Sequence, residues 1–418
     1  MAASLAAAVA IAGIAATGSE ADGVRAGASS DTLTALGKPI RDVTNSDGAA
    51  SGGLTLDLIR EFEADALAAA GYNGAGIDVA LIDTGVTTVP GLHTPGKVLY
   101  GPDLSEEGAA LDTHGLDTYG HGTHMAGIIA GNDGLGAAGF RGMAPDARIV
   151  SLKVAGASGE THIASVIAAI EWVVEHRNTD GLNIRVLNLA LGADGVPSSL
   201  EDPLSAAVER AWAEGIVVVV AAGNRGNQSG GLDSPAVSPY VIATGALNGR
   251  AVRDGVAGYS SAGDGARNPD LVAPGTRVVS LRAPGSTLDT QNPTARIGDR
   301  FMRGSGTSQA AAVLSGSVAL LLSAHPDMTP DQVKYILMNN ANEVERRSTT
   351  LDGVGKVRPD SASDNARYAV DAPPQDHPRA LGITSWEGVD SWTGGEWVGA
   401  SWSGVSWSDV GFTGSSWS

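Results

Sequence analysis

Five short apolar runs, each rich in β-branched residues, constrain the fold of this chain more than any other feature. They are IDVALID (77–83), ARIVSLKV (147–154), RVLNLALG (185–192), GIVVVVAAGN (215–224) and YVIATGAL (240–247). None of these runs alternates apolar with polar residues, as a strand with one face in water would. We therefore expect strands that are buried on both faces, which is typical of a parallel sheet.

Helical patterns separate these runs. In residues 162–177 the apolar positions recur at the i, i+3, i+4 and i+7 spacing of one helix face. Residues 199–215 form a second helical pattern, with acidic residues in its first turn where the helix dipole favours them. The alternation predicts an α/β fold with an open, mostly parallel twisted sheet and helices on both faces. In such sheets functional residues gather at the carboxyl ends of the strands.

Composition excludes several classes of function. The 418 residues contain no cysteine, which excludes disulfides, thiolate catalysis and cysteine metal sites. The formal net charge of −19 opposes binding to nucleic acid or to an anionic membrane surface, so we expect no nucleic-acid partner. We also expect a monomer.

The N-terminus carries a signal-like segment, residues 1–20, with an apolar stretch that ends in small residues but without a positively charged start. We expect a secreted protein, extracellular or in the cell envelope, with a flexible pro-region or linker at 21–53. A disordered Ala-rich start is the alternative for residues 1–20.

Four polar residues stand where the expected elements begin or end. Asp83 closes the first apolar run, His121 opens HGTHMAG, Asn224 follows VVVVAAG, and Ser308 precedes a long apolar helix in GTSQAAA. Burying a carboxylate after four apolar residues is costly unless it is paired. Each residue also has an ordinary alternative: a turn aspartate, a metal-binding histidine pair, a turn asparagine and a helix N-cap serine.

Taken together, Asp83, His121, Asn224 and Ser308 follow one another in the chain order of the subtilase arrangement. The strings DTGV, HGTHMAG, NLALG, AAGN and GTSQAAA resemble the motifs of the subtilisin-like (S8) serine proteases, over about residues 54–370. The resemblance departs after Ser308, where the family usually has Met-Ala-Ser/Thr-Pro and this chain has Gln-Ala-Ala-Ala. None of these four residues supplies a reacting group.

The resemblance implies a serine endopeptidase that hydrolyses protein or peptide substrates through an acyl-enzyme on Ser308. His121 would be the general base and acid, Asp83 would orient His121, and Asn224 would lie in the oxyanion hole. This chemistry needs no cofactor. A non-catalytic, surface-binding protein of the same fold is the alternative, and the mark of such a protein would be a lost triad or oxyanion residue.

The resemblance also implies a substrate pocket with two walls. The wall residues are Leu189, Ala190, Leu191 and Gly192 on one side, and Ala221, Ala222 and Gly223 on the other. Because both walls are small and apolar, we expect an uncharged substrate side chain at P1. Arg225 would lie at the rim, in contact with an acidic or polar P1 residue or simply with solvent.

A structural calcium ion is a further expectation from the resemblance, by analogy with the proteinase K-type arrangement. The carbonyl oxygens of Pro239 and Val241 and the carboxylate of Asp270 would hold it, since calcium takes oxygen ligands.

The domain organisation completes the predictions. We expect a catalytic domain at 54–371, a Pro-rich linker at 372–380 and a tail at 381–418 in which an aromatic residue recurs about every five residues. The tail is either an appendage that contacts a cell surface or glycan, or a segment removed on maturation.

Overall fold

The computed structural model describes residues 55–372, except 111, 136–138, 193–201 and 346–347, together with residues 400–401. The chain divides into two units, residues 1–38 and 39–418, and every described residue belongs to the second. The signal-like segment, the pro-region, most of the linker and most of the aromatic tail lie outside the described residues.

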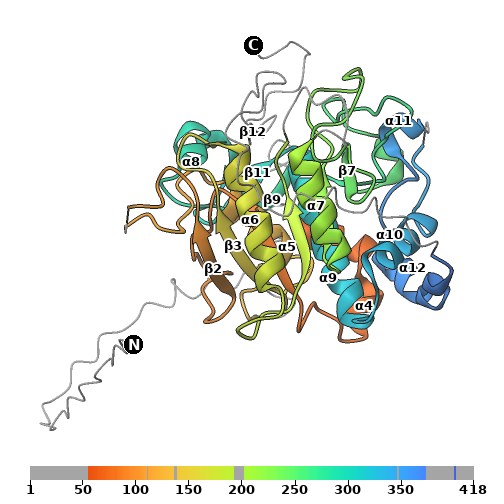
Figure 1. The fold of residues 1–418 in the computed structure, drawn as a ribbon, viewed down its shortest axis with the longest axis horizontal. Coiled ribbons are helices and arrows are strands. Elements are labelled where there is room, and N and C mark those ends of the chain that lie inside the picture. The colour runs from red at the N-terminus through yellow and green to blue at the C-terminus, as the bar shows by residue number, and fades with distance from the viewer. Residues whose placement is uncertain are drawn as a thin grey trace, which may run out of the picture. The chain divides into compact units, whose positions relative to one another are not determined.

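A seven-stranded sheet forms the centre of the described fold (Figure 1). Its strand order is β2-β3-β1-β5-β6-β7-β8, and every neighbouring pair is parallel. The strands are β1 (Asp78–Asp83), β2 (Val98–Asp103), β3 (Arg148–Lys153), β5 (Ile184–Leu189), β6 (Val217–Ala221), β7 (Ile242–Leu247) and β8 (Leu271–Pro274). The five predicted strands are confirmed, and every residue of β1, β6 and β7 is buried.

Two strands of the sheet were not predicted. β2 lies at one edge, where its residues are exposed or half-buried, so it lacks a buried apolar run. β8 has only four residues and ends in a proline. Shorter strands lie outside this sheet: β9 (Val278–Leu281), β10 (Arg296–Ile297) and β11 (Phe301–Gly304) pair with one another, and β4 (Glu160–Thr161) pairs with β12 (Ala400–Ser401).

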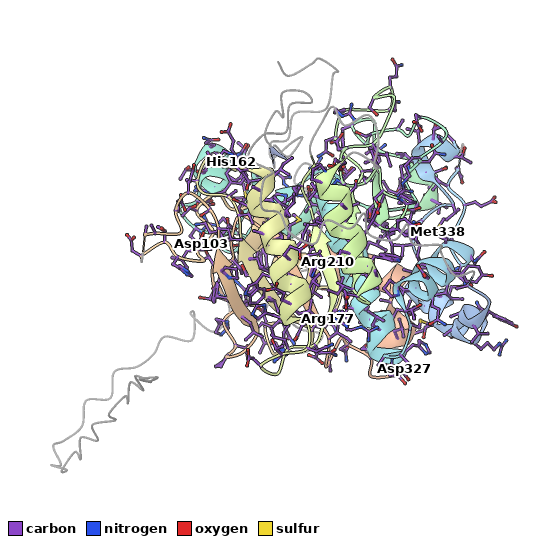
Figure 2. All side chains as sticks on the ribbon, viewed as in Figure 1. Asp103, His162, Arg177, Arg210, Asp327 and Met338 are labelled. Atoms are coloured by element: carbon purple, nitrogen blue, oxygen red, sulfur yellow. The ribbon has the colours of Figure 1, made fainter. Side chains whose placement is uncertain are left out.

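Helices cover both faces of the sheet, which confirms the predicted α/β architecture. In Figure 1, α6 (Ile163–His176) and α7 (Pro203–Ala213) cover the near face, and α5 (His121–Ala130) and α9 (Thr307–Ala324) pack together on the other. Arg210 pairs with Glu171 and Arg177 with Glu214 between α6 and α7; both arginines are labelled in Figure 2. Smaller helices are α3 (Leu56–Glu63), α4 (Asp65–Ala69), α8 (Thr287–Gln291), α10 (Pro330–Asn339), α11 (Thr349–Asp352) and α12 (Pro359–Asp364).

The start of α7 differs from the prediction. The helix begins at Pro203, and its first turn contains no acidic residue. Asp202 is instead the N-cap, with carboxylate oxygens that accept hydrogen bonds from the backbone N–H groups of Leu204 and Ser205 at 3.1 Å each. The carboxylate thus acts through a direct hydrogen-bonded cap as well as through the helix dipole.

The helix α9 passes through the interior, and its residues from Thr307 to Leu322 are all buried. Its length and mean hydropathy of 1.4 would also suit a membrane span, but 89% of the helix is buried inside the fold. This is typical of a core helix in a globular domain.

The sheet topology brings the predicted functional segments to one edge. From β1 the chain builds β2 and β3 on one side and β5 to β8 on the other, so the strand order reverses next to β1. Asp83, Leu189 and Ala221 are the last residues of β1, β5 and β6. Because these strands are parallel, the chain leaves all three at the same edge, where ligands of such sheets bind.

Candidate active site

His121 and Asp83 form a buried pair at this edge. The Nδ1 atom of His121 lies 2.9 Å from Oδ1 and 3.0 Å from Oδ2 of Asp83. Each side chain is only 1% exposed. Asp83 Oδ1 also accepts a hydrogen bond from the Thr84 N–H at 2.7 Å. A carboxylate on Nδ1 fixes the tautomer and orientation of the imidazole ring, which directs Nε2 to the task of a base.

Asp117, which the sequence did not single out, holds the start of α5 in place. Its buried carboxylate accepts hydrogen bonds from the N–H groups of Gly120 and Thr123 at 2.6 and 2.7 Å, and from the hydroxyl of Thr84 at 2.8 Å. The N-cap residue is Gly120, which has no side chain to cap the helix. Asp117 therefore satisfies the N–H of the N-cap residue and one N–H of the first turn, and so fixes the start of the helix at His121.

Gly122 explains the His-Gly pair of the motif. Its N–H donates to the hydroxyl of Thr84 at 2.9 Å. A Cβ atom on Gly122 would lie 2.1 Å from the carbonyl oxygen of Gly85 and 3.2 Å from Oδ1 of Asp83. Only glycine allows α5 to approach the end of β1 this closely.

His124, the second histidine of the motif, is completely buried. Burial, with the charge of His121 as a second cause, lowers its pKa to about 3. The ring is therefore neutral at physiological pH. Within the described ranges, no group of three His, Asp or Glu side chains is placed to hold a metal ion.

Ser308 is the second residue of α9 and is 6% exposed. Its hydroxyl donates a hydrogen bond to the carbonyl oxygen of Ala190 at 2.8 Å, one residue beyond the end of β5. The N-cap of α9 is Gly306, so the interpretation of Ser308 as the cap is wrong. The backbone N–H of Ser308 lies in the first turn, where the N–H groups point out of the helix end.

Asn224 is bound to the residue before Ser308. Its Oδ1 accepts hydrogen bonds from the N–H of Thr307 at 2.9 Å and from the hydroxyl of Thr307 at 3.1 Å. A point at the Cβ position of Gly306 lies 3.6 Å from Asn224 Nδ2 and 3.7 Å from Ser308 N. Two hydrogen-bond donors therefore lie within 3.7 Å of one point beside the N-terminal end of α9, where negative charge is favoured.

The two predicted wall segments follow β5 and β6. The side chains of Leu189, Ala190, Leu191, Ala221 and Ala222 are all buried. A substrate at this edge would therefore meet mainly the backbone of these segments.

Asp233, which the sequence did not indicate, lies between the two walls. A Cβ atom on Gly192 would lie 3.0 Å from Asp233 Oδ2, and a Cβ atom on Gly223 would lie 2.3 Å from it. The Nε atom of Arg225 lies 2.6 Å from Asp233 Oδ1. Arg225 is thus paired with a carboxylate beside the expected pocket, which neither interpretation of the sequence anticipated.

The residues of the expected calcium site do not fit a calcium ion. The ammonium group of Lys334 donates to the carbonyl oxygens of Pro239 and Val241 at 2.8 Å each, and lies 3.0 Å from Oδ1 of Asp270. The three predicted ligands therefore surround a lysine ammonium. Arg267 also binds both carboxylate oxygens of Asp270, at 2.8 and 2.9 Å. A divalent cation at this position would be repelled by both basic side chains.

The charged groups of this cluster shift one another's pKa values. Burial alone would raise the pKa of the Asp270 carboxyl, but Arg267 and Lys334 together lower it below its ordinary value. Burial lowers the pKa of the Lys334 ammonium to about 8, although Asp270 acts in the opposite direction. The N–H of Ala243 provides a further hydrogen bond to Asp270 Oδ2 at 2.8 Å.

Comparisons with known proteins point to one family. The model of the Subtilase family (Peptidase_S8) matches residues 74–364. Serine protease AprX of Bacillus subtilis (strain 168) is 36% identical over 300 residues, which cover 69% of this chain and 66% of AprX. This chain therefore spans about two thirds of the length of AprX.

Other relatives are matched over more of their length. Subtilisin DY of Bacillus licheniformis is 33% identical over 68% of this chain and 89% of its own. Subtilisin Savinase of Lederbergia lenta is 33% identical over 70% of this chain and 93% of its own. The crystal structure of a cold adapted subtilisin-like serine proteinase superimposes with a TM-score of 0.52 and 27% identity, covering 69% of this chain and 88% of that one.

Proposed function

The chain belongs to the subtilase family of serine proteases, and on that premise we propose that it is an endopeptidase whose catalytic triad is Asp83, His121 and Ser308. The observation that carries the proposal is the buried Asp83–His121 pair at the sheet edge where β5 and β6 also end. Ser308, hydrogen-bonded to Ala190 just beyond β5, belongs to the same edge.

In the proposed reaction, Ser308 Oγ attacks the carbonyl carbon of the scissile peptide bond. The new C–O bond forms as the hydroxyl proton passes to His121 Nε2, and the π electrons of the carbonyl move onto its oxygen. When the intermediate collapses, the amine leaves with the proton from His121 and the acyl-enzyme remains. A water molecule then attacks the acyl-enzyme in the same way, with His121 as the base, and releases the acid and the Ser308 hydroxyl. The Ser308 hydroxyl must first exchange the Ala190 carbonyl for His121 as its acceptor.

The oxyanion of the tetrahedral intermediate needs fixed donors. We assign this role to Asn224 Nδ2 and the Ser308 N–H, because both lie within 3.7 Å of one point beside Gly306. The hydrogen bonds from Thr307 to Asn224 Oδ1 support the assignment, since they occupy the oxygen and turn the NH₂ group toward the site.

Protein or peptide substrates follow from the family, and an enzyme outside the cell or in its envelope remains our proposal for location. We also retain a monomer and a surface contact through the aromatic tail as proposals. For P1, the Asp233–Arg225 pair beside an otherwise apolar pocket supports an uncharged side chain, because the pair balances its own charge. The non-catalytic alternative is not favoured, since none of the four site residues is replaced.

Replacement of the nucleophile tests the proposal. Ser308→Ala should lower kcat on the order of 10⁶-fold, the scale of loss when the serine of such a triad is removed. Ser317→Ala is a matched control, because Ser317 is buried in the same helix and its hydroxyl donates to the Val313 carbonyl. Hydrolysis of a peptide substrate by both folded variants gives the result. Near wild-type turnover by Ser308→Ala would contradict the assignment.

A further inference from the structure

Gln309, the residue directly after Ser308, has a buried side-chain amide whose hydrogen bonds are unmade. The residue is 1% exposed. Among the residues that the structure describes, neither Nε2 nor Oε1 of Gln309 has a hydrogen-bond partner. A buried amide without partners destabilises a fold, because water has been removed and nothing replaces it. Such a group calls for an explanation.

The other buried polar side chains of α9 do have partners. Thr307 bonds to Asn224 and Gly223, and the hydroxyl of Ser317 donates to the Val313 carbonyl. Ser315 accepts a hydrogen bond from Asn188 Nδ2 at 2.8 Å. The unmade hydrogen bonds of Gln309 therefore do not reflect a generally unsatisfied helix. They are confined to the position next to the proposed nucleophile.

The amide head of Gln309 lies beside the proposed oxyanion hole. The point at the Cβ position of Gly306 is 2.9 Å from Gln309 Oε1, and the same point is 3.6 Å from Asn224 Nδ2 and 3.7 Å from Ser308 N. Polar atoms of three residues thus lie within 3.7 Å of one point beside Gly306. Two of them are the donors already assigned to the oxyanion.

We propose that Gln309 is a third donor of the oxyanion hole, with its side-chain NH₂ directed at the oxyanion of the tetrahedral intermediate. The amide oxygen and nitrogen exchange places by a half-turn about the last side-chain bond, and no existing hydrogen bond opposes that turn. The inference rests on the proposed function, since it requires an oxyanion formed by attack of Ser308.

A donor of this kind acts mainly in the transition state. The neutral carbonyl of a bound substrate is a weak acceptor, whereas the oxyanion carries a full charge in a site with little water. The hydrogen bond should therefore raise kcat and leave KM nearly unchanged. An amide that merely fills space would affect neither parameter in this selective way.

The test compares Gln309→Met with the matched substitution Gln291→Met, which lies at the exposed end of α8. Methionine keeps the length of the side chain and removes both polar atoms. Gln309→Met should lower kcat about tenfold, with KM within about twofold, which corresponds to about 1.4 kcal/mol of transition-state stabilisation. Gln291→Met should leave both constants unchanged.

Inhibitors provide an independent readout. A peptide aldehyde forms a tetrahedral adduct with the nucleophile, so Gln309→Met should weaken its binding by the same factor of about ten. The corresponding peptide alcohol forms no adduct and should bind equally well. The melting temperature of Gln309→Met should stay constant or rise, because an unpaired buried amide has been removed.

The outcomes separate this inference from the proposed function. Unchanged kcat and aldehyde affinity in Gln309→Met, with activity lost in Ser308→Ala, would overturn the role of Gln309 and leave the triad standing. An equal loss of affinity for aldehyde and alcohol would also overturn it, since that is the effect of disturbed substrate binding. An active Ser308→Ala variant would instead refute the proposed function.

Discussion

The two ends of strand β1 carry the same residue type in two different settings. Asp78 opens the strand at the amino edge, where Arg148 binds its two carboxylate oxygens through Nε and Nη2 at 2.6 Å each and the Asn183 N–H donates at 2.6 Å. Asp83 closes the strand at the carboxyl edge, where its side-chain partner is the imidazole of His121. Both carboxylates are 1% exposed.

The difference lies in what the partners can do. Arginine remains protonated, so the Asp78 pair holds a fixed charge and only stabilises the fold. Histidine gains and loses a proton near neutral pH, so the Asp83 pair can take part in proton transfer. The cluster of Asp270, Arg267 and Lys334 just before β8 resembles the Asp78 pair, because its carboxylate is also bound by basic side chains. At the carboxyl edge, Gln309 keeps polar atoms without partners in the described part of the chain.

Replacing each aspartate of β1 by asparagine in turn is the strongest test of this contrast. Asp83→Asn should lower kcat about 10⁴-fold at nearly constant fold stability, because the amide supports the wrong tautomer of His121. Asp78→Asn should leave kcat unchanged and lower the free energy of unfolding instead. Peptide hydrolysis and thermal unfolding of both variants check the prediction. Similar kinetic losses in both variants would remove the distinction between the edges.

Removing the amide of Asn224 tests the proposed oxyanion hole at the carboxyl edge. Asn224→Leu should lower kcat by about 10² to 10³, or about 2.7–4 kcal/mol, and spare KM, since the lost hydrogen bond matters most in the transition state. Steady-state kinetics give both constants. If KM rises several-fold at constant kcat, Asn224 binds substrate and the oxyanion donor lies elsewhere.

Replacing Lys334 tests whether the charged cluster at the amino edge of the sheet stabilises the fold. Lys334→Met should lower the free energy of unfolding by up to about 3 kcal/mol, because Asp270 and two buried carbonyls lose a partner while Arg267 remains. Thermal unfolding measures the loss, and kcat of the folded variant should be unchanged.

Chelation is the companion experiment. Because an ammonium occupies the expected calcium position, a chelator should change the melting temperature of the wild type no more than that of Asp270→Ala. A clearly larger drop in the wild type would show that Asp270 does bind calcium.

Replacing Arg225 should have the smallest effect and should change only the preference for the P1 residue. Arg225→Ala removes a positive charge beside Asp233, so cleavage after Lys or Arg should rise several-fold relative to cleavage after apolar residues. Adding Asp233→Asn should abolish that gain. A peptide library cleaved by the two variants provides the comparison, and an unchanged profile would place the pair outside the substrate pocket.

Local pattern was sufficient to predict much of the fold. The strands covered on both faces were predicted because most of their positions are apolar, as in β6, where all five residues are Val or Ala. The edge strand β2 and the short β8 lack that requirement and were missed. The start of α7 was misplaced because Asp202 caps the helix from outside its first turn.

The candidate site divides in a similar way. The sequence indicated four site residues because each lies within a recognisable local motif: Asp83, His121, Asn224 and Ser308. Tertiary contacts decide what the sequence could not show, also outside the site: Lys334 meets carbonyl groups 93 and 95 residues away. For Gln309 the sequence showed an unusual residue, and only the structure shows that its amide is buried next to two proposed oxyanion donors.

Covalent labelling shows whether the reactive chemistry resides at the carboxyl edge of the sheet. The full chain, its Asp83→Asn variant and its Asp78→Asn variant would be treated with a serine-reactive fluorophosphonate, and the modified peptide located by mass spectrometry. We predict one modified residue, Ser308, with labelling strongly slowed in Asp83→Asn and unchanged in Asp78→Asn. Modification of a different serine, or equal labelling rates in all three proteins, would contradict the account.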